Sequence, residues 1–169
     1  FSRNLTAVTV GFAVYLNNLP TANAFMLGSF ASSGGFQWFS VNINTVGGIQ
    51  TYTETWNGGT FIEESGPVIT PGGWYFVEMQ VVHDAVVGSY IIKVNNKTIL
   101  SKTNVDTVPS SAQFIIDSAG SAVIDIKAPF YIDDIYCTNS SNSVNTGFLG
   151  DVRVYTLPPH GDTLSAGWT

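Results

Sequence analysis

Apolar side chains occupy every second position in the first clear element of the chain. In segment 6–16 these positions are Val8, Val10, Phe12, Val14 and Leu16. Successive side chains of a β-strand point to opposite faces, so this period of two places all five on one buried face. Two asparagines and a proline follow within residues 17–20, and they end the pattern. The segment is therefore predicted to be a strand with one face on a core.

Similar patterns recur in short segments that turn residues separate. The longest apolar run, 74–83, follows a Pro-Gly-Gly turn and predicts a central strand. Segments 89–94 and 97–100 flank Asn95-Asn96, a pair that tolerates positive φ, and they predict a two-residue hairpin. Further strands are predicted at 36–43, 50–56, 114–117, 122–126, 130–137 and 151–156.

These patterns predict an all-β fold, because no segment longer than a turn has a helical period. About ten short strands at this spacing favour a two-sheet antiparallel jelly-roll sandwich. The length of 169 residues is suited to one domain spanning 1–169. The start at Phe1, with no initiator Met, suggests that this domain is part of a longer polypeptide.

Charge and cysteine content narrow the classes of partner. Only 11% of residues are charged and the net charge is -6, so no basic surface is available for nucleic acid. No apolar run reaches the roughly 18 residues that a membrane-spanning helix needs. Cys137 is the single cysteine, which excludes an intrachain disulfide and a thiolate metal cluster. We therefore predict neither a nucleic-acid partner nor a membrane partner.

Three motifs resemble the jelly roll of laminin G-like domains, concanavalin A-like lectins and glucanases. They are "GGWYFVEMQVVH", "GSYIIKVNNKTIL" and "FYIDDIYC". The tail 130–169 is similar to a recurrent ending of laminin G-like virion proteins from tailed bacteriophages. This resemblance implies a non-enzymatic structural protein on the particle surface, as a capsid decoration or a tail or fibre module. It also implies other virion subunits as partners, and virion symmetry favours a homo-oligomer, with a trimer as the first expectation.

Glycosidase chemistry is not predicted. Glucanases of this fold carry catalytic carboxylates in an E-x-D-x-x-E pattern, which is absent here. Glu63-Glu64 and Asp133-Asp134 are adjacent pairs, so their side chains are expected on opposite faces and could not flank one glycosidic bond. His83 ends an apolar strand and is predicted to be a core or edge residue. We predict that the protein is not an enzyme and has no catalytic residue.

Binding of carbohydrate is the alternative function. Aromatic rings offer flat apolar faces on which sugar rings stack, and polar side chains beside them hydrogen-bond to hydroxyls. The competing interpretation is that these aromatic residues fill the core or a subunit interface. The candidates for stacking are Trp38, Tyr52 and Trp56, with Trp74 also considered, and the candidates for hydrogen bonding are Glu78 and Gln80.

Asp133 and Asp134 lie within an apolar strand, where one carboxylate is expected to face inward and to need a partner. We predict a structural polar network of these two residues with Asp151 and Arg153. A calcium site is the alternative, but it needs several more oxygen ligands than this pattern supplies. We therefore predict no metal and no cofactor.

Overall fold

The computed structural model is all-β, with ten strands and no helix in the residues that it describes. For some strand residues the model describes the backbone alone; these are residues 25, 26, 29, 31, 32, 37, 38, 54, 55, 58, 59 and 111–115. No helix in the described segments could span a membrane. The described residues are 7–21, 25–32, 37–55, 58–84, 86–107, 111–115, 130–140 and 143–152.

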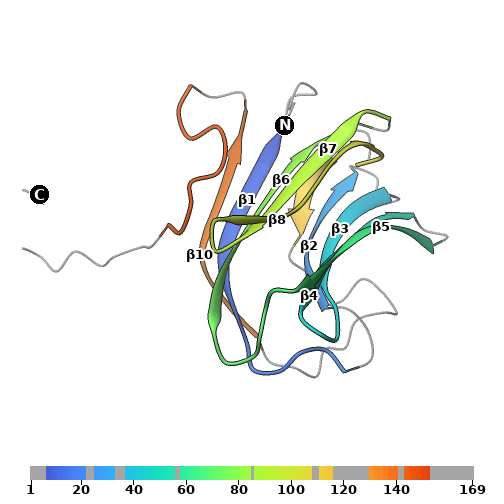
Figure 1. Ribbon diagram of the computed structural model, residues 1–169. Helices are drawn as coiled ribbons and strands as arrows, with labels where there is room; N and C mark the ends of the chain where they lie inside the picture. The colour runs from blue at the N-terminus through green and yellow to red at the C-terminus, as the bar shows by residue number, and fades with distance from the viewer. Residues whose placement is uncertain are drawn as a thin grey trace, which may run out of the picture.

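The strands form two antiparallel sheets that face each other as two layers (Figure 1). Sheet A has five strands in the order β10-β1-β6-β7-β8, and sheet B has five in the order β5-β4-β3-β2-β9. The strands of sheet A are β1 (Val8–Leu16), β6 (Trp74–Val82), β7 (Gly88–Val94), β8 (Lys97–Val105) and β10 (Phe130–Asn139). Those of sheet B are β2 (Phe25–Ser32), β3 (Gln37–Ile43), β4 (Gly48–Thr55), β5 (Gly58–Pro67) and β9 (Ser111–Ile115). The predicted jelly-roll sandwich is confirmed.

The core lies between the sheets and contains the side chains that the alternation selected. Val10, Phe12 and Val14 of β1 are fully buried. Across the core, the Tyr90 ring of β7 packs against the Phe39 ring of β3 at a tilt, with 5.0 Å between ring centroids. The remaining large buried side chains include Phe30, Ile43, Ile49, Ile69, Met79 and Ile92. Burial of apolar surface from both layers is therefore the main stabilising contribution.

One polar link crosses this core. The Tyr90 hydroxyl donates to the Glu63 carboxyl group at 3.0 Å and lies 3.0 Å from the Thr51 hydroxyl. Because Tyr90 is in sheet A and both partners are in sheet B, the contacts connect the layers. Burial is the main reason that the pKa of Tyr90 is raised.

Most predicted strands agree with the structure, and the exceptions are the weakly patterned ones. Strands β1, β3, β4, β6 and the β7–β8 hairpin lie within a few residues of their predicted positions. Strands β2 and β5 were not predicted, since their glycine and polar residues break the alternation. Asp151 and Val152 lie outside any strand, contrary to prediction, whereas 122–126 and 153–156 lie outside the described residues.

Residues 143–152, here called the outer segment, follow β10 and lie against sheet A on the side away from the core (Figure 1). The Phe148 ring lies under the Lys93 ammonium, with 3.7 Å from Nζ to the ring centroid. Further along, the Gly150 N–H donates to Glu78 Oε1 at 2.8 Å. The outer segment therefore covers part of this face and forms one border of the site described next.

Candidate functional site

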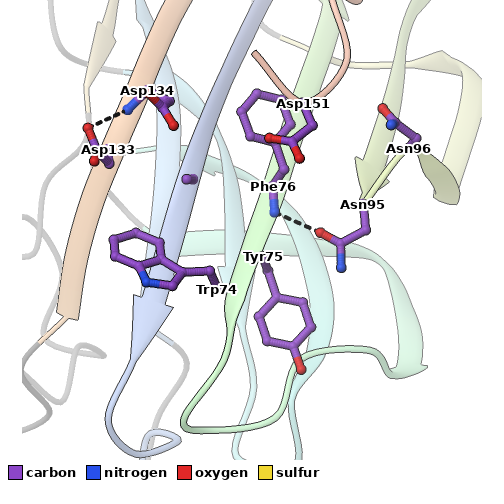
Figure 2. A pocket seen from close by; sticks show the side chains of 9 residues that line it. Trp74, Tyr75, Phe76, Asn95, Asn96, Asp133, Asp134 and Asp151 are labelled. Atoms are coloured by element: carbon purple, nitrogen blue, oxygen red, sulfur yellow. Dashed lines mark hydrogen bonds between the residues drawn. The ribbon is translucent and has the colours of Figure 1, made fainter. Parts of the chain in front are cut away.

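A pocket of about 480 Å³ opens on the outer face of sheet A. It lies where β10, β1 and β6 meet the tip of the β7–β8 hairpin and the end of the outer segment (Figure 2). This volume is in the range of small-molecule sites. The lining residues are Ala13, Trp74, Tyr75, Phe76, Asn95, Asn96, Asp133, Asp134 and Asp151.

A β-bulge places two aspartates on the pocket wall. Gly11 pairs with Tyr136 and Ala13 pairs with Asp133, so β10 uses one residue more than β1 over this interval. Asp134 takes a left-handed backbone conformation, with φ of 52°, and its N–H donates to Asp133 Oδ1 at 2.8 Å. Such a bulge changes the direction of the side chains on the strand. Both carboxyl groups therefore line one pocket.

This arrangement corrects two expectations for the pair. Adjacent strand residues point to opposite faces only where the pairing is regular, and the bulge removes that condition. Neither side chain faces the core, because Asp133 is exposed and Asp134 is half-buried at the pocket. Glu63 and Glu64 do diverge as predicted: Glu63 accepts from core Tyr90, whereas Glu64 accepts from Gln50 on the outer face of sheet B.

The hairpin tip supplies two amides on the opposite side of the pocket. Asn95 and Asn96 both have positive φ, 49° and 65°, as a tight two-residue turn between strands requires. The Asn95 side-chain oxygen accepts from the Phe76 N–H at 2.8 Å, and the Asn95 N–H donates to the Phe76 carbonyl at 2.8 Å. These bonds hold the tip at the end of β6 (Figure 2). The predicted hairpin is confirmed, and it presents polar groups to the pocket.

Trp74 gives the pocket an apolar wall. It is the first residue of β6, and 53% of its surface is exposed. In the close-up its indole lies below Asp133 and Asp134, and the asparagines of the hairpin lie on the other side of the view (Figure 2). An exposed indole beside a polar-rimmed pocket is an arrangement suited to amphipathic ligands.

Hydrogen bonds of the two preceding residues in the outer segment, Leu149 and Gly150, hold Asp151 at the pocket. Glu78 Oε1 accepts from the Gly150 N–H and from the Tyr136 hydroxyl. The same hydroxyl accepts from the Leu149 N–H at 3.1 Å. Burial raises the pKa of Tyr136, which therefore stays protonated and able to donate. Glu78 thus positions the residue next to Asp151.

Gly11 makes room for this arrangement. A Cβ at Gly11 would lie 2.2 Å from Tyr136 Cε1, so only glycine lets the tyrosine ring lie across β1. The absence of a side chain at position 11 is therefore a requirement for the Tyr136–Glu78 hydrogen bond.

Of the five predicted sugar-binding residues, the three whose side chains are described do not form one site with each other. Glu78 is 1% exposed and engaged beneath the outer segment, so its prediction as a surface hydrogen-bonding group is wrong. Gln80 is half-buried in sheet A and donates to the Thr9 hydroxyl at 3.0 Å. Tyr52 lies on the outer face of sheet B, 5.5 Å from the Phe61 ring, on the other side of the sandwich. The side chain of Trp38 and the whole of Trp56 lie outside the described residues.

The predicted polar network stays a prediction. Asp133, Asp134 and Asp151 line the same pocket, and Arg153 lies outside the described residues. Within the described ranges, no three His, Cys, Asp or Glu side chains are placed to hold a metal ion. Asn95 and Asn96 were not predicted as site residues, although their turn was predicted. Trp74 was not predicted at this pocket either, because its position there depends on the pairing of distant strands.

His83 is half-buried beside the core, which agrees with the prediction of a core or edge residue. Its ring is 5.5 Å from that of Phe30, and Nδ1 lies 3.2 Å from the Thr107 carbonyl oxygen. Burial lowers the pKa of His83 and favours its neutral form. It has no place in the pocket.

No protein-family model matches the chain, and no curated protein sequence matches it. Among solved structures it is similar to the carbohydrate binding module CBM66 from Bacillus subtilis, with a TM-score of 0.53 and 12% identity, over 78% of this chain and 74% of that one. It is also similar to domains LG4-5 of the mouse laminin alpha1 chain, with a TM-score of 0.53 and 14% identity. That match covers 80% of this chain and 36% of the laminin chain.

A third similar structure is a heptameric SAP-like pentraxin from Limulus polyphemus, with a TM-score of 0.49 and 16% identity, over 79% of this chain and 64% of that one. Identities this low show the fold alone, and the two matches with a TM-score of 0.53 support that fold. The chain has the two-sheet antiparallel jelly-roll fold of laminin G-like and concanavalin A-like domains.

Proposed function

We propose that the protein is a carbohydrate-binding module and that its site is the pocket on the outer face of sheet A. The observation that carries the proposal is the half-exposed Trp74 beside a pocket edged by aspartates and asparagines. Sugars combine an apolar C–H face with a rim of hydroxyl groups, so they match an aromatic wall with polar groups around it. A solved structure of the same fold, from Bacillus subtilis, is itself named a carbohydrate binding module, which supports the proposal.

The polar groups also define the charge of the ligand. Carboxyl groups accept hydrogen bonds from hydroxyls, and the asparagine amides can donate or accept. Among the described residues that line the pocket, none is basic, and three are aspartates. A carboxylated sugar would be repelled there, because like charges at close range are unfavourable. Neutral glycans are therefore the expected class.

The contribution of Trp74 can be estimated from its exposure. A buried aromatic side chain covers roughly 200 Å², and Trp74 is 53% exposed, so a sugar on one ring face removes about 50–100 Å² from water. At about 25 cal/mol per Å², this is about 1.3–2.5 kcal/mol, or about 10- to 60-fold in Kd.

The test is a glycan array on the wild-type protein, followed by calorimetric titration of Trp74→Ala and Tyr52→Ala with the best neutral ligand. We expect the Trp74 variant to lose at least about ten-fold in affinity. Tyr52→Ala is the matched control, since Tyr52 is an aromatic residue on the outer face of the other sheet. The proposal fails if no neutral glycan binds, or if Tyr52→Ala weakens binding while Trp74→Ala does not.

A structural role on a phage particle stays a second proposal. It rests on the resemblance of 130–169 to virion proteins, and the structure describes only 130–140 and 143–152 of this tail. The two functions are compatible, because a decoration or fibre module can bind surface glycans of the host. Antibody labelling of purified particles tests it, and detection only in particle-free lysate would exclude it. Size-exclusion chromatography with light scattering tests the expected trimer.

A further inference from the structure

A row of three aromatic rings crosses sheet A next to the pocket. Tyr15 of β1 pairs with Trp74 of β6 on one side and with Tyr131 of β10 on the other. The ring centroids are 5.6 Å apart for Tyr15 and Trp74 and 6.0 Å apart for Tyr15 and Tyr131. The row therefore runs across three neighbouring strands on the outer face.

The row is open to solvent at both ends. Trp74 is 53% exposed and Tyr131 is 56% exposed, while Tyr15 is half-buried between them. Each aromatic side chain adds a large apolar area to a surface, and contiguous exposed apolar patches on soluble proteins often mark binding surfaces. The core does not explain the row, since the core side chains of β1 point to the opposite face.

The row and the pocket form one continuous surface. On each of the three strands, the residue two positions from the ring lies on the same face and lines the pocket. Ala13 follows this relation to Tyr15, Phe76 to Trp74 and Asp133 to Tyr131. A ligand held in the pocket therefore lies beside the rings, and a longer ligand would cover them.

The angles between the rings determine the shape of ligand that fits. The planes of Tyr15 and Trp74 are 52° apart, and those of Tyr15 and Tyr131 are 60° apart. A flat crystalline face would need coplanar rings, whereas a single chain can turn from one sugar to the next. Neighbouring strands are about 4.8 Å apart, which is close to the length of one sugar unit.

We propose that the row extends the pocket into a site for a single soluble oligosaccharide chain of at least three units, with one unit in the pocket and the others on the rings. This inference rests on the proposed carbohydrate-binding function. It excludes two other ligand shapes: a lone monosaccharide as the full ligand, and the flat surface of a crystalline polysaccharide.

Titration calorimetry with neutral oligosaccharides of increasing length tests this. The probes are glucose, mannose, galactose, N-acetylglucosamine and fructose, each as the monosaccharide and as linear chains of two to six units. In the series that binds, we expect affinity to rise at least about ten-fold from one unit to three and then to level off. Microcrystalline cellulose and chitin should not remove the protein from solution.

Two variants separate the row from the pocket. Tyr131→Ala should weaken binding of the three-unit chain about ten-fold and leave the monosaccharide affinity unchanged. Ile135→Ala is the control, because Ile135 is a 60% exposed residue of the same strand that is not in the row. Three results would overturn the inference and leave Trp74-dependent binding in place. They are equal affinity for one and three sugar units, an unchanged affinity of Tyr131→Ala for the three-unit chain, and adsorption of the protein to the crystalline polymers. Absence of binding in every series would overturn the proposed function together with the inference.

Discussion

Removing the Tyr136 hydroxyl should destabilise the protein by weakening the attachment of the outer segment to sheet A. In Tyr136→Phe, Glu78 loses one of its two donors and the Leu149 N–H loses its acceptor. Glu78 is 1% exposed, and its second oxygen already has no hydrogen-bond partner in the described part of the structure. The buried carboxyl group would then keep only the Gly150 N–H, at 2.8 Å.

The size of the effect follows from these contacts. Two hydrogen bonds contribute roughly 1 kcal/mol each, and leaving a buried acceptor short of a donor costs roughly 1 kcal/mol more. The total is about 3 kcal/mol in the free energy of unfolding, which is a large fraction of the stability of a typical domain. Tyr136 is half-buried, so water can replace part of the lost bonding and about 2 kcal/mol is the lower expectation.

Urea unfolding followed by tryptophan fluorescence measures this loss. The control is Tyr131→Phe, which removes the hydroxyl of an exposed tyrosine on the same strand and should change stability by less than about 0.5 kcal/mol. A double-mutant cycle with Glu78→Gln should show a coupling energy of about 1 kcal/mol, because the two side chains are in contact. A loss below about 1 kcal/mol in Tyr136→Phe would refute the reasoning, since the bonds would then contribute nothing net.

Three further changes test other parts of the fold. Gly11→Ala should cost about 3 kcal/mol in urea unfolding, because its Cβ would lie 2.2 Å from the Tyr136 ring and displace it; an unchanged midpoint would mean that the ring moves freely. Tyr90→Phe should cost about 1–2 kcal/mol by removing the hydroxyl between Thr51 and Glu63, and a thermal midpoint equal to wild type would contradict that. Burial lowers the pKa of His83 below 6.5, so the unfolded state binds more protons and stability should decline as pH falls below about 6.5, levelling off below the folded pKa. His83→Gln should flatten the stability curve below about pH 6.5, and an identical slope would assign it to other groups.

The local pattern of apolar and polar residues was sufficient to predict the strands with strong alternation. In β1 every second residue is apolar, and in the β7–β8 hairpin Asn95 and Asn96 mark the turn. Strands β2 and β5 escaped prediction because glycine, serine and glutamate interrupt their alternation, so their pairing depends on neighbouring strands. The same limit affected the site: Tyr52 and Glu78 both suggested sugar contacts, yet they belong to different sheets and Glu78 is covered.

By itself, the order of residues determined which faces of the strong strands are buried, since side-chain direction alternates whatever the neighbouring strand is. It could not determine which strands become neighbours, or in what register. Those choices aligned Tyr131, Tyr15 and Trp74 across three strands and introduced the bulge that turns Asp133 and Asp134 toward the same pocket. They depend on contacts between segments more than 50 residues apart in the printed sequence, where packing and hydrogen bonding of the whole sandwich select one register.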